Sequence, residues 1–219
     1  MTPQDNSAGK GIAWKPLLFK FGTGMLVGVV GAMGMIALFE SGMLGPLGPS
    51  REIAALVGLL YLLTAALVGF GLVAPGAGAK LLNVEDAEEI GEMRPMLIWS
   101  CVGTLALAVM LIVAALSGPG APIAAGVGLI ATIALFTLAW FASLRSRSHT
   151  DELMQAVSKE SAGLAFYLAV VIGGGWSLLV HLGFAERALA PLDWLTLFSA
   201  LLLLASFIVV FRRGMVREL

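Results

Sequence analysis

The residues best suited to hold a small molecule are three consecutive glycines followed by a tryptophan, with a histidine shortly after them. Each glycine weakens a helix by roughly 1 kcal/mol relative to alanine, so the run permits a kink or the close approach of a neighbouring helix or ligand. A buried indole N–H also needs a partner. Gly173, Gly174, Gly175, Trp176 and His181 are therefore pocket candidates for a lipid, a quinone or a small hydrophobic ligand. Plain helix packing is the competing interpretation.

A second group of polar residues consists mainly of acids that precede two apolar segments. Such acids can dock a protein partner or bind a divalent cation, but they also suit the first turn of a helix, where the helix dipole favours negative charge. Asn83 and Thr150 are expected to cap these two helices through their side-chain oxygens. The candidate partner-docking residues are Glu85, Asp86, Glu88, Glu89, Asp151, Glu152, Gln155 and Glu160.

The sequence carries no recognisable catalytic motif. It has no phosphate-binding loop, no HExxH zinc motif and no nucleophile paired with a base. A metal site needs several convergent ligands, whereas the chain has one cysteine, Cys101, and two histidines, His149 and His181, expected on opposite sides of a membrane. His181 alone could be an axial ligand or a pH-sensitive group, although a hydrogen-bonded interfacial histidine is the simpler interpretation. We predict no enzymatic activity, no metal and no cofactor.

The elements that carry these residues are predicted to be transmembrane helices. Hydrophobic residues make up 59% of the chain and charged residues 12%, with a mean hydropathy of +0.96, whereas soluble domains have about 25% charged residues. A helix needs about 20 apolar residues to cross a membrane core of about 30 Å. Six segments meet this length: 16–40, 53–74, 95–117, 121–143, 161–183 and 191–212. We predict an all-α transmembrane domain over 16–213, with cytoplasmic tails at 1–15 and 214–219.

Lysine and arginine are strongly biased to one side of this arrangement. Of the 13 such residues, 11 lie in the tails, in the gaps on the same side as the tails or at the span ends next to the tails, and only Arg51 and Arg187 lie on the other side. Cationic residues stay in the cytoplasm during insertion. The bias predicts three hairpins in a bacterial inner membrane with both termini cytoplasmic. The net charge of −1 argues against direct nucleic-acid binding.

Two further patterns concern helix packing. Hairpins 2 and 3 both combine an acidic start, an Ala-Pro turn and a basic end, which suggests a parallel repeat, although any hairpin needs a tight turn and charged ends. Glycines three or four residues apart in the first span share one face, typical of close helix packing within a monomer or a homo-oligomer, with a lipid groove as the alternative. These glycines are Gly24, Gly28, Gly31 and Gly34.

The last part of the chain carries a longer motif. It runs from Asp151-Glu-Leu-Met-Gln-Ala-Val-Ser-Lys-Glu-Ser161 through Ala165-Phe166, a Gly-x-Trp at Gly174 to Trp176, and Gly183 to Arg212-Arg213. This hairpin, Asp151 to Arg213, resembles small uncharacterised bacterial integral membrane proteins often encoded beside helix-turn-helix regulators. The resemblance implies a regulatory role and no established activity. The part of the chain before Asp151 lies outside this resemblance.

The patterns together favour a non-catalytic inner-membrane regulator, scaffold or accessory subunit that acts through its cytoplasmic face and contacts the lipid bilayer and a protein partner. The first alternative is a transporter or channel for a small neutral solute or lipid, with a pocket near Gly173 to Trp176. Acidic and basic residues are absent near the middle of every predicted span, which argues against proton-coupled transport. The second alternative is a cofactor- or lipid-binding protein that uses His181.

Overall fold

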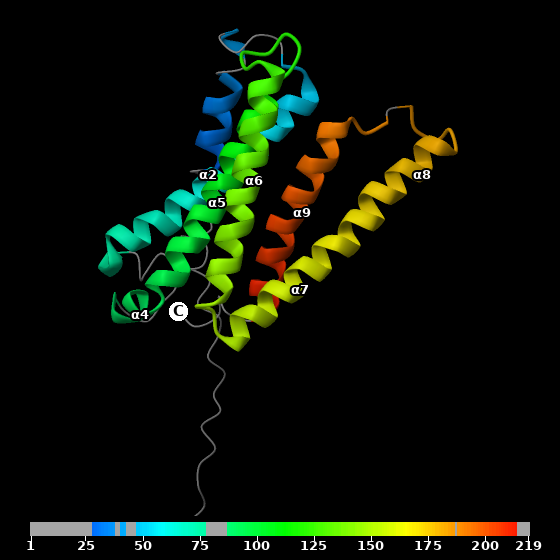
Figure 1. Ribbon diagram of the computed structural model, residues 1–219. Helices are drawn as coiled ribbons and strands as arrows, with labels where there is room; N and C mark the ends of the chain where they lie inside the picture. The colour runs from blue at the N-terminus through cyan, green and yellow to red at the C-terminus, as the bar shows by residue number, and fades with distance from the viewer. Residues whose placement is uncertain (1–27, 38–39, 43–46, 78–86, 187, 214–219) are drawn as a thin grey trace, which may run out of the picture.

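The computed structural model describes residues 28–37, 40–42, 47–77, 87–186 and 188–213 of the 219-residue chain. Their secondary structure is helical (Figure 1). A helix at Gly28–Ala37 comes first. The elements that follow are α2 (Pro49–Val73), α4 (Ala87–Glu92), α5 (Arg94–Ala115), α6 (Ala125–Arg147), α7 (Glu152–Ala169), the π-helix η1 (Val170–Gly174), α8 (Gly175–His181) and α9 (Pro191–Arg212).

Within the described ranges, five helices are long and apolar enough to cross a membrane, which indicates a membrane protein with a helical fold. They are α2, α5, α6, the continuous stretch Glu152–His181, and α9. The elements α7, η1 and α8 thus follow one another without a break as one helical stretch. Of the first predicted span, 16–40, the described part includes the helix Gly28–Ala37, and most of the rest lies outside the described residues.

Two local expectations about helix starts need correction. Asp151, not Thr150, caps α7: its carboxylate accepts a bond of 2.7 Å from the Met154 backbone N–H, while the Thr150 hydroxyl donates to the Ser146 carbonyl. The fourth span also begins later than the predicted residue 121. The turn before it is closed by backbone bonds that pair Leu116 and Gly118 with Ile123, so α6 begins at Ala125.

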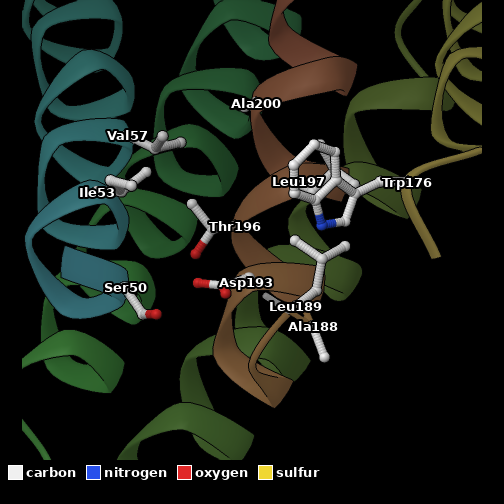
Figure 2. A pocket seen from close by; sticks show the side chains of 10 residues that line it. All are labelled: Ser50, Ile53, Val57, Trp176, Ala188, Leu189, Asp193, Thr196, Leu197 and Ala200. Carbon is white, nitrogen blue, oxygen red and sulfur yellow. The ribbon is translucent and has the colours of Figure 1, made fainter. Parts of the chain in front are cut away.

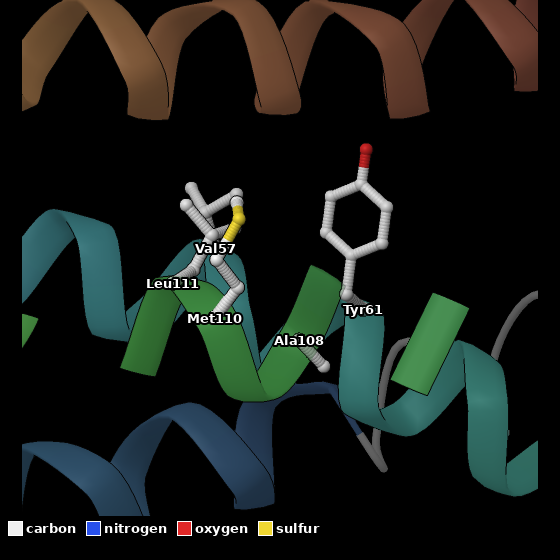
Figure 3. Packing of buried hydrophobic residues seen from close by; sticks show 5 residues of the cluster. All are labelled: Val57, Tyr61, Ala108, Met110 and Leu111. Atoms are coloured by element: carbon white, nitrogen blue, oxygen red, sulfur yellow. The ribbon is translucent and has the colours of Figure 1, made fainter. Parts of the chain in front are cut away.

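The core lies where α2 packs along α5, and α5 along α6. Figure 3 shows residues of its central cluster, Val57 and Tyr61 from α2 and Ala108, Met110 and Leu111 from α5, with the Tyr61 hydroxyl pointing toward α9. The Tyr61 hydroxyl donates a hydrogen bond of 2.8 Å to the Ser199 carbonyl of α9. Because an unpaired hydroxyl is costly in an apolar core, this bond fixes α9 against α2.

The C-terminal hairpin packs differently, because α7 contacts α9 rather than α6. At the end where α6 finishes and α7 starts, Glu160 accepts two hydrogen bonds from the Arg213 guanidinium at 2.8 and 2.9 Å. Toward the other end the continuous helix diverges from α9, and α8 lies away from the bundle (Figure 1). The hairpin is therefore closed at one end and open at the other.

The two ends of the bundle differ in charge. We call the end with the α6–α7 connection the basic end, because the described cations near it are Arg94, Arg145, Arg147, Lys159, Arg212 and Arg213. At the opposite end, which we call the turn end, Arg51 at the start of α2 donates to the Pro119 carbonyl in the α5–α6 turn. The antiparallel hairpins thus bring together cations that are far apart in the sequence.

Large apolar side chains cover much of the outside of the molecule. Ile130 on α6 is 72% exposed and Val171 on η1 is 70% exposed, and similar residues follow both helices. In water this surface would promote aggregation, whereas lipid chains solvate it at little cost. Its position agrees with the five apolar helices in indicating lipid contact.

Candidate functional site

An apolar pocket lies at the turn end between α2, α8 and α9 (Figure 2). Its volume is about 350 Å³, in the lower range of small-ligand sites. The residues around it are Ser50, Ile53, Val57, Trp176, Ala188, Leu189, Asp193, Thr196, Leu197 and Ala200. We call this cavity the Trp176 pocket.

The π-helix explains how the chain forms this side of the hairpin. Gly173 is buried against α9: a Cβ at this position would lie 2.7 Å from Cζ3 of Trp194 and 2.9 Å from Cδ2 of Leu197. A Cβ at Gly174 or Gly175 would meet nothing within 4 Å among the described atoms. One glycine of the three is thus required by packing, and the other two leave the wide π-turn unobstructed. Single π-turns within helices are often found at functional sites.

The predicted pocket candidates are therefore separated by the structure. Trp176 lines the pocket and is 41% exposed, whereas Gly173 packs against α9 and lies next to the cavity rather than in its lining. His181 is exposed at the end of α8 and lines neither cavity described here. Of the five predicted candidates Trp176 alone is among the residues that line this pocket, and α2 and α9 supply most of the others.

The polar groups of the Trp176 pocket are largely engaged with the protein itself. Asp193 accepts a bond of 2.7 Å from the Ala190 backbone N–H at the start of α9. The hydroxyl of the buried Thr196 donates a hydrogen bond of 3.0 Å to the Leu192 carbonyl. A carboxylate and a hydroxyl used in this way offer few free bonds to a ligand. The pocket therefore suits a neutral, mainly apolar molecule.

A larger groove lies at the basic end, between the start of α5, the end of α6 and the start of α7. Its volume is about 610 Å³. Its lining combines hydroxyl groups, two cations and apolar side chains, so we call it the amphipathic groove. The lining residues are Met96, Trp99, Ser100, Gly103, Thr104, Leu107, Ala139, Ser143, Ser146, Arg147, Thr150, Met154, Gln155, Ser158, Lys159 and Ala162.

The predicted docking residues take three different positions around α7. Asp151 and Glu152 are exposed at its start, beside the amphipathic groove but outside its lining. Gln155 lines the groove and donates 3.0 Å to the Thr150 carbonyl. Glu160 is bound to Arg213 and so connects α7 to α9.

The docking candidates of the second hairpin are only partly described. Glu88 is exposed on the short helix α4. Glu85, Asp86 and the side chain of Glu89 lie outside the described residues, as does the expected cap Asn83. Among the described candidates, Asp151 and Glu152 lie together at the start of α7.

The glycine face of the first span is partly described as well, since Gly24 lies outside the described residues. A Cβ on Gly31 would meet Leu59 and Leu63 at 3.5 Å, an ordinary contact, and one on Gly28 or Gly34 would meet nothing within 4 Å. A much closer helix contact, which the sequence analysis missed, occurs elsewhere. A Cβ on Gly58 would lie 2.8 Å from Cγ1 of Ile112, where α2 crosses α5.

The described residues contain no group of three or more His, Cys, Asp or Glu side chains that could hold a metal ion. His149, at the basic end, has its Nδ1 within 2.9 Å of the Arg145 carbonyl, and His181 lies at the turn end. Cys101 contacts the Ala65 carbonyl through its sulfur at 3.4 Å. Each of these side chains is therefore isolated from the others.

Comparisons of the chain with protein-family models, with curated proteins and with solved structures gave no match. A proposal about function therefore depends on the two cavities and on the exposed start of α7.

Proposed function

We propose that this protein is a non-catalytic bacterial inner-membrane regulator, scaffold or accessory subunit that binds a cytoplasmic protein partner. In this proposal six helices span the membrane, both termini are cytoplasmic, and the basic end faces the cytoplasm, in line with the positive-inside rule. Hairpins 2 and 3 form a parallel repeat, and the first helix, with its glycine face, is available for packing or for a homo-oligomer.

The observation that carries the proposal is the exposed start of α7. Asp151 and Glu152 have no ion-pair partner among the described residues, and the apolar side chain of Leu153 beside them is 53% exposed. Anionic headgroups of the cytoplasmic leaflet repel acidic side chains. An acidic surface with an apolar centre at the membrane face therefore suits a protein with a basic surface, such as the regulators that accompany the similar membrane proteins.

Co-purification tests this proposal. The variant Asp151→Asn with Glu152→Lys removes the acidic character but keeps a residue that can cap α7. The matched control is Glu186→Lys, which changes an exposed acid beyond α8 at the turn end. A partner that crosslinks to the native protein in cells should be lost with the double variant and retained with the control. Equal recovery with all three proteins would sink the docking hypothesis.

The Trp176 pocket favours a second candidate, a carrier or channel for a small neutral solute or lipid. Its apolar lining and engaged polar groups are the specific reason. Uptake of apolar and neutral solutes into proteoliposomes should fall with Trp176→Ala and remain with Trp140→Ala, because Trp140 is exposed on α6 away from the pocket. Uptake that is absent, or that responds equally to both changes, rules this candidate out. A cofactor site at His181 has no comparable support.

A further inference from the structure

We propose that the amphipathic groove binds the headgroup and upper acyl chain of an anionic phospholipid. Arg147 from α6 and Lys159 from α7 both line it. Neither side chain has an ion-pair or hydrogen-bond partner among the described residues, and no acidic residue contributes to the described lining. Among the described residues that line the groove, the charged side chains are thus both cationic.

The order of residues along the groove gives it a direction. On α6 the lining runs from Arg147 inward to Ala139, and on α7 from Met154 inward to Ala162, with Thr150 in the connection between the two helices. On α5 it runs from Met96 to Leu107, which corresponds to about 16 Å at the rise of a helix. Arg147 ends α6, and Lys159 adjoins Glu160, which pairs with Arg213 at the end of α9, so both cations lie toward the basic end. The side chains of Leu107 and Ala139 lie at the inner end of the lining.

This gradient matches a phospholipid and not a free phosphate compound. The phosphate would lie between Arg147 and Lys159, where charge-assisted hydrogen bonds are strongest. The first methylene groups would then follow Gly103 and Leu107 toward the membrane interior. Basic pockets between transmembrane helices are a recurrent way to bind anionic headgroups.

The hydroxyl groups leave room for additional contacts. Thr104 and Thr150 already donate to main-chain carbonyls, at 2.8 and 2.6 Å. Ser100, Ser143 and Ser158 also line the groove, and these hydroxyls make no hydrogen bond within the described residues. They can donate to phosphate or glycerol oxygens. A headgroup with both charge and hydroxyl groups, such as phosphatidylglycerol, fits this set.

Native mass spectrometry of the full chain measures this binding directly. The protein is titrated with phosphatidylglycerol and, separately, with phosphatidylcholine. The test variant carries Arg147→Gln with Lys159→Gln. The control is Arg145→Gln, which removes one positive charge two residues from Arg147. The Arg145 guanidinium lies over the Phe141 ring, 5.6 Å from its centroid, and Arg145 does not line the groove. Because each basic residue near the headgroups contributes about 1 kcal/mol, the double variant should lose affinity on the order of tenfold or more.

The expected result is preference for phosphatidylglycerol, a large loss with the double variant, and a change of less than about twofold with Arg145→Gln. Arg147→Lys with Lys159→Arg should retain binding, since the charges stay, whereas Ser143→Trp should reduce binding by filling the groove while leaving both charges. Circular dichroism checks that each variant keeps its helices. An equal loss with Arg145→Gln would show general surface attraction and overturn the site. Displacement of the lipid by glycerol phosphate at equal concentration would overturn the assignment to a lipid.

Discussion

Replacement of Gly173 by alanine should destabilise the C-terminal hairpin, while the same change at Gly174 should not. A Cβ at position 173 would lie 2.7 Å from Cζ3 and 3.1 Å from Cη2 of Trp194, and 2.9 Å from Cδ2 of Leu197. Ordinary contact begins at 3.4 Å, so the indole would have to retreat by about 0.7 Å. Position 174 has no described atom within 4 Å of its Cβ.

The size of the difference follows from two opposing effects. Alanine in place of glycine favours a helix by about 1 kcal/mol at either position. Overpacking a close contact typically costs about 1–3 kcal/mol, with a midpoint of about 2 kcal/mol, and this cost applies only at position 173. The propensity gain is common to both variants and cancels in their comparison. Gly173→Ala should therefore be about 2 kcal/mol less stable than Gly174→Ala.

The assay is reversible unfolding in mixed micelles, with SDS as the denaturant and helical circular dichroism as the signal. A double-mutant cycle with Trp194→Phe isolates the contact, because the smaller ring removes the distal indole atoms that meet the new Cβ. In that background the penalty for Gly173→Ala should fall to about 1 kcal/mol, because the new Cβ still meets Cδ2 of Leu197 at 2.9 Å. If Gly173→Ala and Gly174→Ala are equally stable in the native background, the close contact between η1 and α9 is not a feature of the folded protein.

Three other substitutions test single interactions by the same unfolding assay. Tyr61→Phe removes the hydrogen bond to Ser199 and should lower the free energy of unfolding by about 0.5–1.5 kcal/mol. Tyr167→Phe, at an exposed position on α7, should change it little. Equal effects of the two substitutions would contradict the hydrogen bond between α2 and α9. Ser161 is buried, and its hydroxyl has no hydrogen-bond partner among the residues that the structure describes, so Ser161→Ala should leave stability unchanged or raise it. A loss above about 1 kcal/mol would show that this hydroxyl does make a hydrogen bond in the folded protein. Asp151→Ala should lower the free energy of unfolding by about 1 kcal/mol and reduce protection from hydrogen exchange in the first turn of α7. Asp151→Asn should keep both, because asparagine can also cap a helix. Identical hydrogen exchange in the two variants would argue against this cap.

The helices of this protein could be predicted well because their signal is local. Five of the predicted segments overlap long apolar helices, although the fifth helix begins at Glu152 and not at the predicted residue 161. Helix ends were less predictable. Thr150 and Asp151 are both good capping residues, and only the direction in which the chain leaves α6 determines which side chain meets the free backbone N–H groups.

The cavities were less predictable because they depend on which helices meet. Trp176 was singled out because it follows three consecutive glycines, but Ile53, Thr196 and Leu197, which line the pocket with it, come from α2 and α9. Nothing in the local pattern around those residues distinguishes them from other apolar positions in the same helices. The close approach at Gly58 could not be predicted for a related reason. A single glycine gives no periodic signal, and its contacts with Ile112 and Ala108 exist only because α5 crosses α2 at this point.

The amphipathic groove arises from a choice of packing partner that the sequence does contain. A short connection from α6 to α7 would ordinarily make the two helices neighbours along their length. Val157, Ser161, Ala165 and Ala169 recur every four residues and form the buried face of α7. A row of such small side chains lets two helices approach closely, and here the close partner is α9, with the Glu160–Arg213 pair at one end. Because α7 is held by α9, its other face is not covered by α6, and Lys159 and Arg147 are left to line the groove between them. The small-residue face and the exposed cations are thus two consequences of one packing arrangement, and a change that weakens the first should also alter the second.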